Sequence, residues 1–372
     1  MRGIGLVVHR GRAVARDVAT RVAQWAGQRG VRCVEIDVWD PAIERLSALE
    51  EAERAGNPDL IVTVGGDGTF LRGARVAAPI GALVLGVNVG RVGFLTEVTV
   101  DKLDAALEAI GNHQIRIDPR MMLTMRASRE LALPEGMDAL LRYGRGPALP
   151  APKPRTDVPT ESAWGVPLDI LALNDIVFEK LARDRQASVG IYIDGRLFAS
   201  YSADALIVSS PTGSTAYSFS AGGPILSPHL DALVFTPVAP HMVFNRSLVL
   251  SIEQRIGVRV LERSGQVAVS VDGQLRGVLD PGDWVSVYAG PRRARLVRLV
   301  DSQFLDRVRA KFGLADAAAA LADGDTPLVY NPGVPLPPDM AHPGPPESGT
   351  PQPEKPQPEK PHPELHGEDA HV

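Results

Sequence analysis

The segment Leu60-Ile61-Val62-Thr63-Val64-Gly65-Gly66-Asp67-Gly68-Thr69 places three glycines and a carboxylate directly after an apolar run. Such a run is typical of a parallel strand that is buried on both faces. Glycine has no Cβ, so the backbone amides of the loop can approach a bulky anion. A helix that begins near Thr69 would add its positive N-terminal end. This order of strand, glycine loop and helix predicts an α/β fold with a phosphate site at the end of the strand.

The carboxylate of Asp67 needs an explanation of its own, because a negative side chain repels phosphate. The role of general base is the obvious candidate. Two interpretations of the loop stay open: a cradle for phosphate, or a tight turn in which Asp67 only caps the helix. No Gly-Lys-Ser/Thr follows, and the Gly-x-Gly-x-x-Gly spacing is missing, so the loop is neither a Walker loop nor the dinucleotide fingerprint. In the cradle, the expected phosphate contacts are Gly65, Gly66, Gly68 and Thr69.

The rest of the first third alternates strands and helices. We expect strands at 4–8, 31–38, 60–64 and 83–87, and helices at 13–28, 41–55 and 102–110. This rhythm predicts a doubly wound, Rossmann-like sheet with right-handed crossovers. Ligands on such sheets bind at the carboxyl ends of the strands, where residues 65–69 and 88–94 both lie.

The pattern changes near residue 115 to short apolar or alternating runs. Asp-Gly turn pairs separate several of these runs, as at 194–195 and 272–273. The pattern predicts an all-β, sandwich-like second domain. Expected strands are 115–117, 121–125, 169–173, 176–178, 189–193, 205–208, 248–252, 257–261, 267–271, 284–288 and 295–299, with a closing helix at 303–312.

Domain limits follow from these changes of pattern. We place the α/β domain at 1–120 and the β domain at 121–290, with a proline-containing insertion at 127–165 that is expected to be disordered. The tail, 314–372, is proline-rich and repeats Pro-Gln-Pro-Glu-Lys at 351–355 and 356–360. Such a composition cannot bury enough apolar surface to fold, so a solvated appendage is favoured over a protein-docking segment.

Composition excludes several classes of protein. The 372 residues carry a net charge of −5, which argues against an obligate nucleic-acid binder. Cys33 is the single cysteine, so an intrachain disulfide and a cysteine-based metal site are excluded. No apolar stretch approaches the length of a membrane span, and the N-terminus lacks the apolar core of a signal peptide. We therefore expect a cytoplasmic protein without membrane or nucleic-acid partners.

A second group of functional candidates lies in the C-terminal half. Residues 209–224 are rich in hydroxyl side chains and have glycines near both ends, which suits contacts to ribose, phosphate or an amide. A plain surface loop is the alternative. Asn174-Asp175 interrupts an otherwise apolar run. Adjacent side chains of a strand point to opposite faces, so at least one of the two is expected to be buried and to need a hydrogen-bond partner. A turn or bulge at this position is the alternative. No grouping has metal-ligand spacing, and a metal would arrive with a phosphate.

Four motifs in this order resemble the bacterial NAD kinases: Gly65–Thr69, Gly86–Leu95, Asn174-Asp175 and Pro211–Pro224. The resemblance covers about residues 3–313 apart from the insertion. The first motif is shared with phosphofructokinases and with diacylglycerol and sphingosine kinases. The motif at 211–224 is far more specific to the NAD kinases.

The resemblance implies a fold like that of NAD kinase and diacylglycerol kinase, in which a segment at 291–313 returns to the first domain. It implies transfer of phosphate from ATP to the adenosine ribose 2′-hydroxyl of NAD, which gives NADP. Mg²⁺ would be carried with ATP, and the family's members are generally homodimers or homotetramers. Polyphosphate in place of ATP, and NADH in place of NAD, remain open.

The resemblance also assigns roles to individual residues. Asp67 takes the position of the proton acceptor. The family's NAD-contacting positions are occupied here by Asp67, Gly68, Phe94, Asn174, Asp175, Asp204, Thr215, Ala216, Tyr217, Ser218 and Ser220, and more loosely, by spacing, by Arg185, Ala239 and Gln274. Two departures shorten or alter the pattern: Asn174-Asp175 replaces Asn-Glu, and Asp204-Ala205 replaces Asp-Gly.

Two other functions are weighed against this one. A lipid or sugar kinase of the same superfamily would share the first motif but not the one at 211–224. A non-catalytic NAD(P)-sensing module would not need the carboxylate of Asp67.

Overall fold

The computed structural model describes residues 1–38, 47–90, 93–134, 151–155, 158, 164–181, 185–299 and 304–314, together with 335, 337 and 340. The chain divides into two units, Met1–Gly313 and Leu314–Val372. All elements described below belong to the first unit. The predicted disorder of the tail concerns residues that lie almost entirely outside the described ones.

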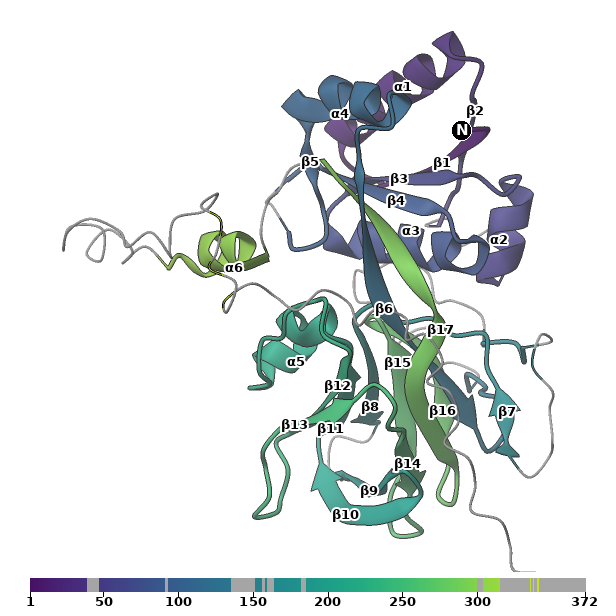
Figure 1. Ribbon diagram of the computed structural model, residues 1–372. Helices are drawn as coiled ribbons and strands as arrows, with labels where there is room; N and C mark the ends of the chain where they lie inside the picture. The colour runs from purple at the N-terminus through teal and green to yellow at the C-terminus, as the bar shows by residue number, and fades with distance from the viewer. Residues whose placement is uncertain are drawn as a thin grey trace, which may run out of the picture. The chain divides into compact units, whose positions relative to one another are not determined.

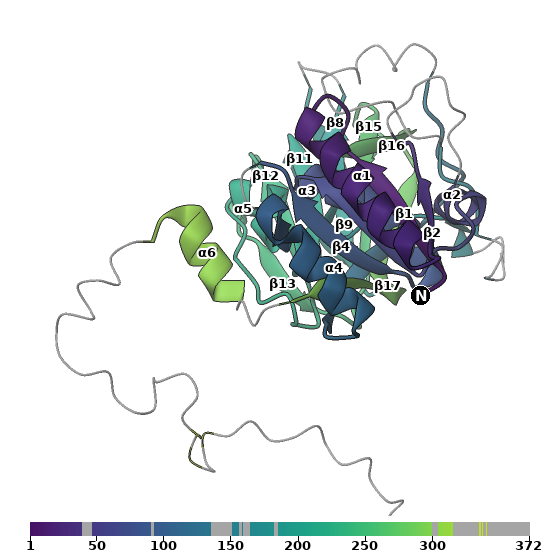
Figure 2. The ribbon, with the colours of Figure 1, turned by 90° about the horizontal axis from the view of Figure 1, so that it is seen from above.

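The N-terminal half is a parallel sheet with helices on both faces (Figure 1). Its strands run in the order β2-β1-β3-β4, with bounds β1 Gly3–Val8, β2 Arg32–Glu35, β3 Leu60–Gly65 and β4 Leu83–Asn88. Apolar side chains of α1 (Ala13–Gln28) and α4 (Leu103–Gly111) form a core with one face of this sheet. Those of α3 (Asp67–Ile80) pack on the other face, and α2 (Ala48–Arg54) lies beside α3. Figure 2 shows α1 and α4 side by side over the strands.

The C-terminal half is built from antiparallel strands in two layers. A six-stranded sheet has the order β13-β12-β11-β8-β15-β16, from β8 Asp175–Lys180, β11 Ala205–Ser209, β12 Ala232–Val238, β13 Leu248–Ser251, β15 Val267–Val271 and β16 Gln274–Leu279. The strands β9 Ala187–Ile193, β10 Arg196–Ala203 and β14 Ile256–Val260 form the second layer. One apolar core, which includes Tyr201 and Phe235, fills the space between the layers.

Two long strands connect the halves. β6 (Arg116–Ala127) and β17 (Trp284–Arg298) pair antiparallel along their lengths, and β17 also pairs with β14 and, in parallel, with β4. A single 11-stranded sheet therefore runs through both halves, and it also includes the short strands β5 (Val98–Thr99) and β7 (Val166–Pro167). The domain limits placed at 120 and 290 fall inside β6 and β17. A 3-10 turn (Val100–Lys102) precedes α4. The last described helix of this unit is α6 (Phe304–Phe312), which follows β17.

Several elements differ from the sequence-based expectations. Residues 169–173 form no strand but one isolated bridge, from Ala172 to Leu123. β10, β12 and β16 were not expected. β10 is a largely exposed strand whose apolar residues, such as Leu197 and Phe198, do not alternate with polar ones, and β12 contains Pro237, which disfavours a strand inside a sheet. The helix expected at 41–55 begins only at Ala48, because Ser47 has an extended backbone and caps α2, and residues 39–46 lie outside the described part.

The insertion expected to be disordered has ordered ends. Ala127 belongs to β6, and Leu131 is buried against the β domain. Bridges join Ala132 to Val278 and Pro154 to Leu168. The prediction of disorder is therefore wrong for residues 127–134 and 151–155, and most of the remaining insertion lies outside the described residues. In the part of the chain that is described, no helix is both long and apolar enough to span a membrane.

Candidate active site

Asp67 is the first residue of α3, and Gly66 before it has an extended backbone. The carboxylate accepts the backbone N–H of Phe94 at 2.9 Å and that of Leu95 at 3.2 Å. These donors belong to the loop after β4, so the side chain joins the ends of two neighbouring strands. The alternative in which Asp67 only caps its own helix does not describe this arrangement.

Glycines make this contact possible. A Cβ on Gly93 would lie 2.0 Å from an oxygen of Asp67, and a Cβ on Gly65 would lie 2.3 Å from the hydroxyl of Thr69. A Cβ on Gly66 or Gly68 would meet no atom within 4 Å. The expected phosphate contacts are therefore of two kinds: Gly66 and Gly68 border open space, whereas Gly65 and Thr69 are buried behind them.

Asn174 and Asp175 stand at the start of β8, and their backbone is held by a carboxylate from another strand pair. Asp272 accepts the N–H groups of Leu173 at 2.9 Å, Asn174 at 2.7 Å and Asp175 at 3.1 Å. Asp272 has φ 48° and lies in the turn between β15 and β16. The sequence indicated this turn but not the function of its side chain.

Asp175 is buried and Asp272 is half-buried. Burial, with a smaller effect from the Asp272 charge, raises the pKa of Asp175 to about 7, although the N–H of Tyr217 donates to its carboxyl group. Burial raises the pKa of Asp272 to about 6 despite its three N–H donors. Two strongly perturbed carboxyls in contact with one loop are typical of a functional site.

The segment 209–224 packs against this loop and is not a plain surface loop. After β11 it forms a 3-10 turn (Gly213–Thr215) and α5 (Tyr217–Ser220). The N–H of Ser210 donates to the Asn174 carbonyl at 2.8 Å, and a Cβ on Gly213 would lie 2.1 Å from that carbonyl oxygen. Gly213 thus permits the close approach that brings Tyr217 to Asp175.

The remaining expected contacts fall into two groups. Burial raises the pKa of the Tyr217 hydroxyl, and so do the nearby carboxylates of Glu179, Asp175 and Asp204. Asp204 therefore lies on the same side as Tyr217, and Lys180 pairs with it at 2.6 Å. Together with Asn174 and Asp175, these residues form one side of the site, which we call the wall. Its other members are partly or fully accessible: Thr215, Ala216 and Ser220.

Four residues stand apart from that wall. Ser218 is fully buried and its hydroxyl bonds to Thr236 at 2.9 Å, so it packs rather than faces a ligand. Ala239 is exposed after β12 with φ 45°. Arg185 is exposed, and no hydrogen bond or ion pair joins it to another described residue. Gln274 lies against Arg72, and with its side-chain amide turned over its oxygen accepts from both Nη atoms of Arg72, at 3.1 and 2.9 Å.

A buried ionic network supports the Phe94–Leu95 loop. Arg298 donates to Glu97 at 2.9 Å, to Asp118 at 3.0 Å and to the Leu95 carbonyl at 3.2 Å. Burial acts to raise the pKa of Asp118, but Arg120 and Arg298 outweigh it and hold that pKa at about 2. Arg120 also donates to Thr212 at 3.3 Å, so the network extends to the segment at 209–224.

Helix α6 completes the support from outside. Arg307 donates to the carbonyls of Phe94 and Thr96, both at 3.1 Å, and pairs with Glu97. The rings of Phe94 and Phe312 are 6.1 Å apart, and Phe312 lies 4.7 Å from Phe219 of α5. Sequence reasoning missed these residues, because an arginine in a short amphipathic helix gives no signal of its distant partners.

The arrangement places one accessible carboxylate, that of Asp67, beside glycine amides. Within the part of the chain that is described, this carboxylate faces no preformed metal cluster. Among the described residues, no group of three His, Cys, Asp or Glu side chains could hold a metal ion. Mg²⁺ is often bound by one or two carboxylates together with substrate phosphates, which this site could provide.

Comparison with known proteins agrees with this geometry. Residues 4–115 match the ATP-NAD kinase N-terminal domain family, and residues 173–299 match the ATP-NAD kinase C-terminal domain family. The chain is 60% identical over 346 residues to NAD kinase 1 of Streptomyces avermitilis, across 92% of this chain and 97% of that protein. It is 39% identical over 318 residues to the NAD kinase of Heliobacterium modesticaldum, across 84% of this chain and 98% of that protein.

Solved structures share the fold. Yeast NADH kinase, solved with NADH, matches with a TM-score of 0.65 at 21% identity, over 85% of this chain and 88% of that one. The NAD kinase of Archaeoglobus fulgidus, solved with ATP, matches with a TM-score of 0.56 at 23% identity, over 84% and 98%. With both of its domain families matched and close relatives aligned over nearly their full length, the chain belongs to the ATP-NAD kinase family.

Proposed function

We infer that this protein is an NAD kinase, which transfers the γ-phosphoryl group of ATP to the 2′-hydroxyl of the adenosine ribose of NAD and so makes NADP. One observation carries the assignment of the site within the family. The carboxylate of Asp67 is held by the Phe94 and Leu95 amides and lies beside Gly68, which borders open space. A fixed carboxylate next to an accessible glycine turn suits a base that works beside phosphate.

In this function Asp67 orients the ribose hydroxyl toward the γ-phosphorus and accepts its proton as the new P–O bond forms. The bond between the γ-phosphorus and the bridging oxygen breaks, and ADP leaves with that electron pair. Phosphoryl transfer depends mainly on positioning and on stabilisation of charge. Mg²⁺ carried with ATP would offset phosphate charge near Asp67. Gly66 and Gly68 provide the exposed backbone of the phosphate cradle.

The wall formed by Asn174, Asp175 and the accessible residues of the segment at 215–220, without the buried Ser218, binds NAD. Because the pKa of Asp175 is raised to about 7, a large share of this carboxyl is protonated near neutral pH and donates a hydrogen bond. A protonated Asp175 and the amide of Asn174 match a ribose hydroxyl or a ring nitrogen of the adenosine. Tyr217 is 42% exposed and offers a ring face for stacking.

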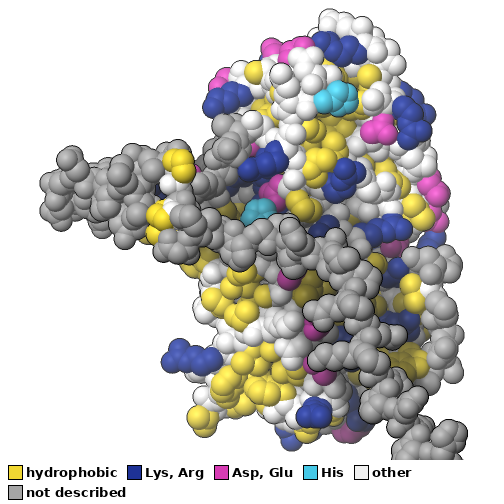
Figure 3. Space-filling view, viewed as in Figure 1, with side chains coloured by type: hydrophobic (Ala, Val, Ile, Leu, Met, Phe, Trp, Pro, Cys, Tyr) yellow, Lys and Arg dark blue, Asp and Glu magenta, His cyan; other side chains and the backbone are white. Residues whose placement is uncertain are grey.

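We also propose a homo-oligomer. Apolar side chains gather over the lower left of the molecule in Figure 3. On the edge strand β10, Leu197 is 60% exposed and Phe198 is 43% exposed, and the Phe198 ring lies 5.7 Å from that of Phe244. Apolar groups of this size on a sheet edge are typical of a subunit interface. Light scattering of the wild type and of Leu197→Asp tests this, and a wild-type monomer at micromolar concentration would contradict it.

The cytoplasm is the proposed location, because a reducing compartment suits a chain with one cysteine. The function itself is tested by NADP formation from NAD and Mg-ATP with the purified protein. Parallel reactions with a diacylglycerol and a sugar phosphate test the rival kinases. Tight NAD binding without any turnover would favour the sensing module instead.

A further inference from the structure

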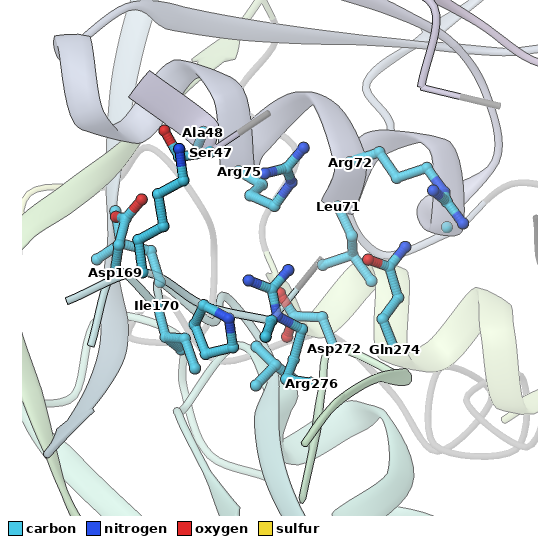
Figure 4. A pocket seen from close by; sticks show the side chains of 16 residues that line it. Ser47, Ala48, Leu71, Arg72, Arg75, Asp169, Ile170, Asp272, Gln274 and Arg276 are labelled. Atoms are coloured by element: carbon cyan, nitrogen blue, oxygen red, sulfur yellow. The ribbon is translucent and has the colours of Figure 1, made fainter. Parts of the chain in front are cut away.

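A basic cavity opens beside Gly68, between α3 and the start of β16 (Figure 4). Its cationic lining is Arg72, Arg75, Lys153 and Arg276, and Gly68 and Gln274 line it as well. The cavity has a volume of about 50 Å³. This space holds a few water molecules or a phosphoryl group and is too small for a nucleoside.

The cavity follows one face of the helix that begins with the proposed base. Gly68, Leu71, Arg72 and Arg75 are spaced three and four residues apart, so they share a face of α3. The rise of an α-helix places Arg75 about 10 Å along the axis from Gly68. These four residues therefore form a row along α3 that extends from Gly68, next to Asp67, into the cavity.

Arg276 is the unusual member of this lining. It is only 7% exposed, its Nε atom has no hydrogen-bond partner, and no ion pair joins it to another described residue. In Figure 4 its guanidinium points into the cavity, toward Arg75. Burial, and then the charge of Arg75, lowers the pKa of Arg276 to about 9. A buried cation that faces another cation is costly unless an anion joins them.

The other charged groups of the cavity are already engaged, including the buried Arg72, which donates to the Val38 carbonyl at 3.2 Å. Arg75 pairs with Glu51, and Lys153 pairs with Glu50 at 2.8 Å. The oxygens of Asp272 accept three backbone N–H groups. Asp169, on the far wall, and Glu51, the partner of Arg75, both attract Arg276, but neither forms a described ion pair with it. Arg276 is therefore the buried cation with hydrogen-bonding capacity left for a ligand.

We propose that this basic cavity binds one phosphoryl group of the phosphoryl donor's phosphate chain, with Arg276 as the buried cation that holds it. The proposal rests on the proposed kinase function and names the donor subsite of the same active site. The cavity begins at Gly68, next to Asp67. Its lining includes Gly68 and Gln274, two of the positions that the resemblance assigns to NAD, but none of Phe94, Asn174, Asp175 or Tyr217, so it adjoins the wall assigned to NAD. The nucleoside of ATP would remain outside, and an inorganic polyphosphate would present the same chemistry.

The kinetic test compares Arg276→Gln with wild type on both substrates. We expect the KM for Mg-ATP to rise about tenfold or more, because a charge-assisted contact is lost, while the KM for NAD changes less than twofold. Arg276→Lys keeps the charge and should recover part of the affinity. Arg259→Gln, on the exposed face of β14, is the matched control and should change neither value. Repeating the series with polyphosphate as donor distinguishes a site for any phosphate chain from one that depends on the nucleoside.

A binding test does not depend on turnover. Inorganic tripolyphosphate should raise the Tm of the wild type and of Arg259→Gln, and should have little effect on Arg276→Gln. Without ligand, Arg276→Gln should melt at or above the wild-type temperature, since it removes an unpaired buried charge. A rise in the KM for NAD alone, or unchanged tripolyphosphate binding in Arg276→Gln, would overturn the proposal. A third outcome is that tripolyphosphate binds only when Arg276 is present, but the protein does not phosphorylate NAD. That outcome would contradict the proposed function, and the cavity would then be an anion site without a role in NAD phosphorylation.

Discussion

The Asp67 carboxylate accepts the backbone N–H of Phe94 at 2.9 Å, which ties the proposed base to the loop that carries a proposed NAD contact. The two residues follow different strands, β3 and β4, which lie side by side in the sheet. Arg307 holds the same loop from the other side through the Phe94 carbonyl. The position of the base thus depends on strand pairing, on a backbone loop and on the last helix of the unit.

Replacing Asp67 by Asn should remove most turnover while NAD still binds. The amide cannot accept a proton from the ribose hydroxyl, and loss of a general base typically costs about 10²–10⁴ in rate. Steady-state rates and calorimetry with NAD measure the two halves of this prediction, and a melting curve checks the fold. A kcat close to that of the wild type would exclude Asp67 as the base.

Gly93→Ala should damage activity through the same contact. The added Cβ would lie 2.0 Å from the Asp67 carboxylate, so the loop or the base must move. We expect kcat to fall by at least tenfold, since small misplacements of a reacting group are costly. Gly265→Ala, where a Cβ meets no atom within 4 Å, is the control. Equal activity in the two variants would show that the Asp67 contact has no importance for turnover.

The pair Asp175 and Asp272 predicts a pH dependence of stability. Both folded-state pKa values, about 7 and about 6, exceed the ordinary value of 3.8. Between pH 4 and 7 the folded chain therefore holds protons that the unfolded chain has released, and the free energy of unfolding falls as pH rises. Asp175→Asn should make this fall shallower and should gain stability relative to the wild type at pH 8.

Urea unfolding at several pH values between 4 and 8 measures this effect. Glu262→Gln, which changes an exposed carboxyl, should follow the wild-type curve. Parallel curves for Asp175→Asn and the wild type across this range would contradict the prediction.

Arg298→Met should destabilise the protein by about 3–5 kcal/mol, because it leaves the buried carboxylates of Glu97 and Asp118 short of a partner. Arg295→Met, on the exposed face of the same strand, loses one hydrogen bond to the Gly81 carbonyl and should cost about 1 kcal/mol. Chemical denaturation of both variants gives the comparison. Similar losses would mean that the buried network contributes little beyond a surface contact.

Deletion of residues 330–372 should leave the Tm and kcat unchanged. The segment is rich in proline and offers no apolar core to lose. Calorimetric melting and steady-state kinetics of the truncated and full chains test this. A Tm lower by several degrees would instead reveal that the tail docks on the folded unit.

Much of the N-terminal half could be predicted from local pattern. The helix at 13–28 has the predicted bounds, and β3 and β4 lie where apolar runs indicated buried strands. Local pattern failed where a strand is a largely exposed edge without apolar alternation, as in β10, or where a side chain acts at long range. Asp272 was recognised as a turn residue, but its three backbone partners are about 100 positions away in the chain.

The sequence by itself determined the glycine turn around Asp67, the Asn174-Asp175 pair and the hydroxyl-rich segment at 209–224, because glycine spacing and polar interruptions of apolar runs are local properties. Only the tertiary structure decided that Ser218 is buried, that Asp272 holds the Asn174–Asp175 backbone, and that Arg276 faces Arg75 in a cavity beside Gly68. Burial and charge pairing depend on which strands become neighbours, and that depends on the whole chain rather than on any one segment.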